Sequence, residues 1–113
     1  MNEYPADQSI VLLITNDGMG QADAELQHKL LNTYLRLLDE NSVLPNAICF
    51  YTDGVKLVTE GSPALDALRS LQAKGVRLIV CQTCLNYFGL LDKVQAGIVG
   101  GMPDIIEALL FTN

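Results

Sequence analysis

The sequence predicts an α/β fold: a three-layer α/β/α sandwich built on a mainly parallel sheet of four to five strands. Short aliphatic runs alternate along the chain with longer segments whose apolar residues recur at helical spacing. This alternation is typical of parallel sheets with helices on their faces. The run at 10–14 is apolar at every position, so we expect a central strand covered by helices on each side.

The first elements follow in order from these patterns. A strand is expected at 9–15, and an amphipathic helix at 23–40, where Leu and Tyr residues form a stripe at helical spacing. A second strand at 47–51 ends in a turn at Asp53 and Gly54.

The second helix has the clearest boundaries. Ser62 suits the N-cap, Pro63 suits the first helical position, and Gly75 is placed to end the helix. The remaining expected elements are a strand at 76–81, a short helix at 83–88, a strand at 97–99 and a last helix from near Pro103.

Length and charge limit the class of protein. The 113 residues are 50% hydrophobic, with 13 acidic and 7 basic side chains and a net charge of −6. We expect one domain spanning 1–113, with 1–8 as an N-terminal extension. The few Lys and Arg residues argue against nucleic acid as a partner. No apolar run approaches the about 20 residues that span a bilayer, and the polar start lacks a basic signal segment. We therefore expect a cytoplasmic protein with no membrane partner.

Ligands of parallel α/β sheets bind beyond the carboxyl ends of the strands, where loops and helix N-termini converge. In this chain the expected edge consists of residues 16–20, 52–54 and 81–84 together with Gly100 and Gly101. The acidic residues of this edge are expected to stabilise a helix N-terminus, and its glycines to permit tight turns. The glycines do not form a dinucleotide-binding or P-loop pattern.

Cys81 and Cys84 form a C-x-x-C pair where the third strand meets the short helix. Unpaired N–H groups and the helix dipole favour an anion at a helix start, so we expect a lowered pKa for Cys84 and moderate nucleophilicity. The alternative is that both thiols pack as small apolar side chains, which is the expected role of Cys49.

Tyr87 and Phe88 are expected in the core or at an interface. One Cys pair and the single histidine, His28, which is distant in sequence, do not supply the four ligands of a structural zinc site, so no metal site is expected.

Three segments occur together: Asp17-Gly18-Met19-Gly20 followed by 24–26, the stretch 50–62, and the most specific one, 81–90. In this order and spacing they resemble the DsrE/DsrF-like superfamily of small sulfur-handling proteins. Within it, they are most similar to the C-terminal domain of YedF-type sulfurtransferase-like selenium metabolism proteins. The resemblance covers nearly the whole chain. It implies a five-stranded α/β/α sheet, homo-oligomers, and a cysteine that carries sulfur as a persulfide without a cofactor.

Carried over to this sequence, the resemblance places the sulfur acceptor in the motif from Cys81 to Cys84. Within the motif we expect Cys84 to be the acceptor, because the helix N-terminus favours its thiolate. Cys81 is the alternative acceptor, or a resolving thiol that expels the sulfur and leaves a disulfide. The residues expected to line the pocket are Asp17, Gly18, Met19, Gly20, Thr52, Asp53, Gly54, Gln82 and Thr83.

The sequence departs from this family pattern at both ends. Nothing before Ser9 could form the N-terminal domain resembling the sulfur carrier TusA, so we expect a TusA-like carrier or other thiol protein in trans. The family's final strand has no counterpart before Asn113, which leaves an open position on the sheet.

We therefore expect a cytosolic sulfur-relay protein, a persulfide carrier or sulfurtransferase linked to selenium metabolism. A second hypothesis is a non-catalytic oligomeric binding or redox-sensing module with structural cysteines. A thioredoxin-like oxidoreductase is a weaker third, because the pair lacks the usual aromatic-Cys-Gly-Pro-Cys setting.

Overall fold

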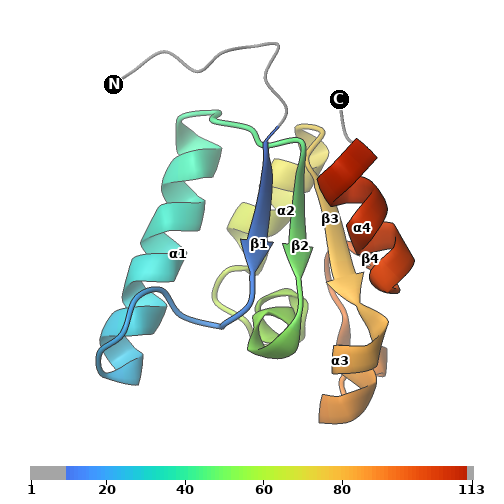
Figure 1. Ribbon diagram of the computed structural model, residues 1–113. Coiled ribbons are helices and arrows are strands. Elements are labelled where there is room, and N and C mark those ends of the chain that lie inside the picture. The colour runs from blue at the N-terminus through green and yellow to red at the C-terminus, as the bar shows by residue number, and fades with distance from the viewer. Residues whose placement is uncertain (1–9, 112–113) are drawn as a thin grey trace.

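The computed structural model describes residues 10–111. Within this range four parallel strands form one sheet in the order β1-β2-β3-β4 (Figure 1). The strands are β1 (Val11–Ile14), β2 (Ala47–Phe50), β3 (Arg77–Cys81) and β4 (Ile98–Gly100). The helices are α1 (Ala24–Glu40), α2 (Leu65–Ala73), α3 (Gln82–Phe88) and α4 (Met102–Phe111), with 3-10 helices η1 (Thr52–Val58) and η2 (Leu91–Lys93). The predicted α/β class with a parallel sheet is confirmed.

The helices are divided between the two faces of the sheet. α1 and α2 pack against each other on one face, and α4 lies on the other against β3 and β4 (Figure 1). The short α3 extends beyond the carboxyl ends of the strands, beside η1 (Figure 1). This end of the sheet is where the sequence predicts the functional loops.

The prediction that the first strand is central is wrong. β1 pairs with β2 alone and forms an edge of the described sheet. The residues of its apolar run differ in burial: Ile14 is buried, whereas the side chain of Leu13 is 44% exposed. The centre of the sheet is β2, where all four residues are buried, together with β3. An apolar run alone does not distinguish these positions, because the residues of a strand do not specify which other strands pair with it.

The boundaries of α2 differ slightly from the prediction. Ser62 Oγ accepts a hydrogen bond of 3.1 Å from the backbone N–H of Ala64, so the serine caps the turn that precedes the helix. α2 then begins at Leu65 rather than at Pro63. Gly75 follows its end with φ of 104°, a left-handed conformation that glycine adopts without steric cost.

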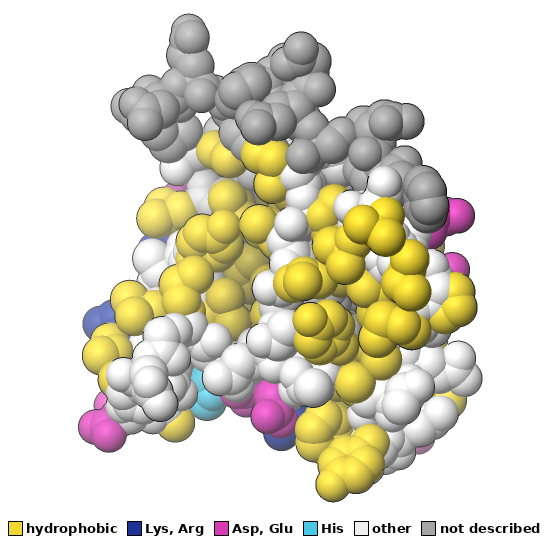
Figure 2. Space-filling view, viewed as in Figure 1, with side chains coloured by type: hydrophobic (Ala, Val, Ile, Leu, Met, Phe, Trp, Pro, Cys, Tyr) yellow, Lys and Arg dark blue, Asp and Glu magenta, His cyan; other side chains and the backbone are white. Residues whose placement is uncertain are grey.

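The surface also carries apolar side chains. They gather over α4, at the right of Figure 2. The large exposed ones on β4 and α4 are Ile98, Val99, Met102, Ile106, Leu109 and Leu110.

Some predictions fall outside the described residues, namely the extension at 1–8 and the start of the first strand at Ser9. None of the helices within residues 10–111 has both the length and the apolar character needed to cross a membrane.

Candidate functional site

The C-x-x-C pair lies at the junction of β3 and α3. Cys81 is the last residue of β3 and the N-cap of α3, and Cys84 is the third residue of that helix. Cys81 is only 3% exposed, whereas Cys84 is partly exposed, and both are free thiols. Cys49 lies fully buried in β2, so its predicted packing role is confirmed. Of the three thiols, Cys84 is therefore the one that an outside molecule can reach.

Cys84 opens onto a cavity of about 390 Å³ at the carboxyl edge of the sheet. The cavity is lined by Thr52, Asp53, Thr83, Cys84, Tyr87 and Phe88. Three of the predicted pocket residues are thus beside the thiol, and they come from two separate strand ends. Gln82 is exposed at the start of α3 and is not among the lining residues.

Thr52 places a hydrogen-bond donor on the sulfur. Its backbone N–H donates to Cys84 Sγ at 3.0 Å. The residue has φ of 49°, a left-handed conformation that is rare for a β-branched side chain. Its hydroxyl donates to the backbone carbonyls of Thr15 and Tyr51, and these bonds oppose the strain. The first residue of η1 is therefore held in the conformation that directs its N–H at Cys84.

The expected lowering of the Cys84 pKa is wrong. Burial raises the pKa of Cys84, the hydrogen bond from the Thr52 N–H lowers it, and the neighbouring Cys81 thiol raises it further. Loss of water around the sulfur penalises the charged form, and this is the largest influence on the Cys84 pKa. The thiolate of Cys84 is therefore scarce at neutral pH, and the Thr52 N–H is the group that favours it.

A charged pair borders the cavity. Lys56 Nζ lies 2.7 Å from Asp53 Oδ1, and the carboxylate raises the pKa of Lys56. The same ammonium lies 4.5 Å from the centroid of the Phe88 ring, a cation–π contact. The Tyr87 ring meets Phe88 edge-on at 5.3 Å between centroids. These contacts join η1 to α3 beside the cavity.

The sequence predicts no role for Lys56, and it predicts Tyr87 in the core or at an interface. Tyr87 is in fact 83% exposed, so it is not a core residue. A signal was available in the spacing: residues three and four positions after Cys84 share its face of a helix.

The glycine loop after β1 lies apart from the Cys84 cavity. Gly18 packs so closely on α1 that an added Cβ would lie 2.6 Å from the Cβ of Gln27. The Met19 N–H donates to the Gln27 carbonyl at 2.9 Å. Asp17 Oδ2 lies 3.4 Å from His28 Nε2, and both line a separate small hollow that also contains Lys56. Neither these residues nor Gly20 line the cavity beside Cys84.

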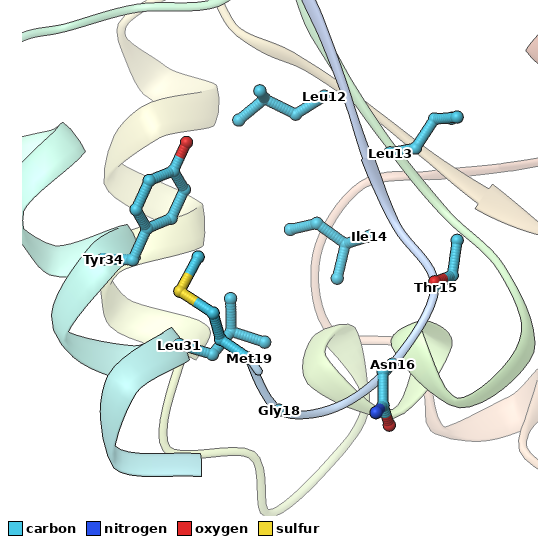
Figure 3. Close-up of a pocket in the computed structure, with 9 residues that line it drawn as sticks. All are labelled: Leu12, Leu13, Ile14, Thr15, Asn16, Gly18, Met19, Leu31 and Tyr34. Carbon is cyan, nitrogen blue, oxygen red and sulfur yellow. The ribbon is translucent and has the colours of Figure 1, made fainter. Parts of the chain in front are cut away.

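Met19 instead lines an apolar cavity of about 240 Å³ between β1 and α1. Figure 3 shows Leu12 and Ile14 pointing toward α1, with Met19 beside Tyr34, while Leu13 points the other way. The predicted pocket residues are therefore separated in the structure. Some line the thiol cavity, Gly18 and Met19 line the apolar cavity, and Asp17 lines the small hollow.

Gly54 has a packing role beneath β1. A Cβ at this position would lie 2.0 Å from the carbonyl oxygen of Ile14. The glycine lets η1 approach the end of β1 and brings Thr52 within reach of the Thr15 carbonyl. Within residues 10–111, no group of three or more His, Cys, Asp or Glu side chains is arranged to hold a metal ion.

These features define a small α/β protein with a reachable thiol at the carboxyl edge of a parallel sheet. The chain belongs to the DsrE/DsrF-like family, whose sequence model matches residues 6–110. None of the curated proteins compared with the chain matches it.

Two solved structures share the fold. The YchN protein from E. coli has a TM-score of 0.66 and 18% identity, over 91% of this chain and 92% of its own. A protein of unknown function from Methanobacterium thermoautotrophicum, MTH1491, has a TM-score of 0.63 and 22% identity, again over 91% and 92% of the two chains.

Proposed function

We propose that the protein is a sulfur-relay protein that accepts sulfur as a persulfide on Cys84 and passes it to a thiol of a partner protein. The observation that carries the proposal is the partly exposed Cys84 thiol, whose sulfur accepts a hydrogen bond from the Thr52 N–H within a cavity. Membership of the DsrE/DsrF-like family supports it.

The reaction needs only thiol chemistry. The Cys84 thiolate attacks the outer sulfur of a donor persulfide, the donor S–S bond breaks, and the donor leaves as a thiolate that takes up a proton. An acceptor thiolate then attacks the outer sulfur on Cys84, and Cys84 leaves as a thiolate. A hydrogen bond to a charged group contributes about 1.5–3 kcal/mol. The Thr52 N–H therefore stabilises the Cys84 thiolate both as it attacks and as it leaves.

The proposal extends to partners on the basis of the YedF resemblance. The donor or acceptor is a TusA-like carrier or another thiol protein acting in trans, and the chain works as a homo-oligomer in the reducing cytosol. The exposed apolar side chains on β4 and α4 are consistent with a homo-oligomer. The free thiols are consistent with a reducing compartment. The resemblance of 81–90 to YedF-type proteins also supports selenium as a second cargo, since a selenium atom at the oxidation level of persulfide sulfur forms an analogous S–Se bond to cysteine.

The test is sulfur loading by a cysteine desulfurase with cysteine, followed by intact and peptide mass measurement without reductant. We expect an increment of one sulfur atom on Cys84 that reductant removes and that moves to a second thiol protein. Cys84→Ala abolishes it, whereas Cys49→Ala, at a fully buried thiol in β2, does not. Absence of an increment on wild type, while a control carrier loads normally, overturns the proposal.

A specific observation favours one other function. Burial raises the pKa of Cys84 and so slows its nucleophilic chemistry, as expected for the non-catalytic binding or redox-sensing module. In that case the folded Cys84→Ala variant is indistinguishable from wild type in every sulfur assay.

A further inference from the structure

Cys81 is a nucleophilic group that the relay reaction leaves unused. It caps the N-terminus of α3, and Cys84 follows three residues later on the same first turn. The Cys81 side chain lies close enough to Cys84 to raise the pKa of its thiol. Residues three apart on a helix have Cβ atoms about 5–6 Å apart, and a disulfide needs about 3.5–4.5 Å. A small closure of this turn therefore joins the two sulfurs.

Access separates the roles of the two cysteines. Cys81 is 3% exposed, so the persulfide of a donor protein cannot reach it, whereas Cys84 lines the cavity. Cys81 meets sulfur only after Cys84 has been loaded. The Sγ atom of Cys84 then becomes the inner sulfur of the persulfide, and it is the persulfide sulfur attached directly to the turn that also holds Cys81.

We propose that Cys81 is a resolving thiol: when no acceptor is docked, it attacks the inner sulfur of the Cys84 persulfide and releases hydrogen sulfide. The inference rests on the proposed relay function and gives the same site a second activity. A bond forms between the sulfurs of Cys81 and Cys84, and the bond between Cys84 Sγ and the outer sulfur breaks. The outer sulfur is reduced and leaves as hydrosulfide with the proton from Cys81. The Cys81 sulfur is oxidised to the disulfide level, and an external dithiol restores both thiols.

The leaving groups favour release over internal transfer. Attack on the inner sulfur expels hydrosulfide, whereas attack on the outer sulfur would expel the Cys84 thiolate. The better leaving group in thiol exchange is the one with the lower pKa. Because burial raises the pKa of Cys84, hydrosulfide is the better of the two. Each persulfide is therefore either passed to an acceptor or released as sulfide, and the acceptor concentration decides between these fates.

The experiment follows the persulfide in the full chain without an acceptor. Inorganic polysulfide loads Cys84 chemically, so loading does not depend on a donor enzyme, and the excess is removed by gel filtration. Free sulfide and the unreduced mass are then measured over time. On wild type we expect the one-sulfur increment to decay to a mass lacking two hydrogens, with one equivalent of sulfide released. Dithiothreitol then restores the starting mass.

The variants assign the effect to Cys81. In Cys81→Ala the increment persists and sulfide release falls to the background level. Cys81→Ser gives the same result and serves if the alanine variant fails to fold, as judged by circular dichroism. Cys49→Ala behaves as wild type. The inference is overturned if the folded Cys81 variants release sulfide as fast as wild type, or if the wild-type persulfide persists with no disulfide.

The two proposals fail in different ways. If polysulfide loads Cys84 and sulfide is released but no protein donor or acceptor exchanges sulfur with it, the relay fails and the resolving role stands. If sulfur passes between proteins but no disulfide forms, the resolving role fails. If polysulfide leaves Cys84 unloaded, both are wrong.

Discussion

The backbone N–H of Thr52 donates a hydrogen bond of 3.0 Å to the sulfur of Cys84. The two residues are 32 positions apart in sequence, and they meet because β2 and β3 are neighbouring parallel strands whose following segments leave the same edge. Among the influences on the Cys84 pKa, this bond is the one that lowers it, against burial and the Cys81 thiol. The reactivity of Cys84 therefore depends on the conformation of Thr52.

The first prediction tests this dependence. Thr52→Val removes the hydroxyl that bonds the Thr15 and Tyr51 carbonyls, so the strained left-handed backbone relaxes and its N–H moves away from the sulfur. Losing a hydrogen bond to a charged group is worth about 1.5–3 kcal/mol, so alkylation of Cys84 by iodoacetamide at pH 7 should slow by roughly tenfold or more. The measurement is the alkylation rate of Cys84, followed by peptide mass.

Two variants serve as controls for this prediction. Thr52→Ser keeps the hydroxyl and should react at nearly the wild-type rate. Thr59→Val removes a hydroxyl bond of 2.9 Å to the Lys56 carbonyl at the other end of η1, and it should leave alkylation unchanged. Wild-type reactivity in Thr52→Val would show that the backbone N–H does not control the thiol.

The second prediction concerns the charge on the cavity wall. Asp53 lines the cavity beside Cys84, and its carboxylate disfavours a thiolate there while neutralising Lys56. In Asp53→Asn the negative charge is lost and the Lys56 charge is unpaired, so the Cys84 pKa should fall. Exposed charge pairs are worth up to about 1 kcal/mol, so alkylation should accelerate by up to about fivefold at low salt and less at high salt. Asp66→Asn, on α2, should have no effect; slower alkylation of Asp53→Asn contradicts the charge argument.

Local patterns predicted the elements and their order well. Residues close together in sequence determine several features of the fold. These features are the apolar stripe on α1, the aliphatic runs of the strands and the end of α2 at Gly75. The edge position of β1 was not predictable, because the residues of a strand do not specify which other strands pair with it.

The candidate site was predictable only in part. The sequence places Cys84, Thr52 and Asp53 at one edge, since parallel strands deliver their following loops together. The direction of the Cys84 pKa shift was not predictable, because it depends on how much water the folded chain removes from the sulfur. The contact of Lys56 with Phe88 joins two elements distant in sequence, and no local spacing indicates it.

The third prediction tests the packing that positions Thr52. A Cβ at Gly54 would lie 2.0 Å from the Ile14 carbonyl oxygen, a backbone atom that cannot swing aside. Overpacking of this kind costs about 1–3 kcal/mol, so urea unfolding of Gly54→Ala should show that loss in the free energy of unfolding. Alkylation of Cys84 should slow as well. Gly101→Ala, where the nearest atom to an added Cβ is at an ordinary 3.4 Å, should change neither quantity much. Wild-type stability in Gly54→Ala would mean that η1 shifts freely beneath β1.

The fourth prediction concerns alkaline pH. Burial raises the pKa values of Cys49 and Cys84 above those of an unfolded chain. At a pH above the ordinary thiol pKa the unfolded state binds fewer protons than the folded state, so the free energy of unfolding falls as pH rises. The contribution of these thiols is complete below the unfolded pKa and is lost as pH rises through the folded values. Urea midpoints measured across this range should decline less steeply for Cys49→Ala and for Cys84→Ala than for wild type.

The alkylation rate of Cys84 in wild type should still be rising across this pH range, because its thiolate forms only at these higher pH values. An alkylation rate that levels off near neutral pH would mean that the Thr52 hydrogen bond outweighs burial at Cys84.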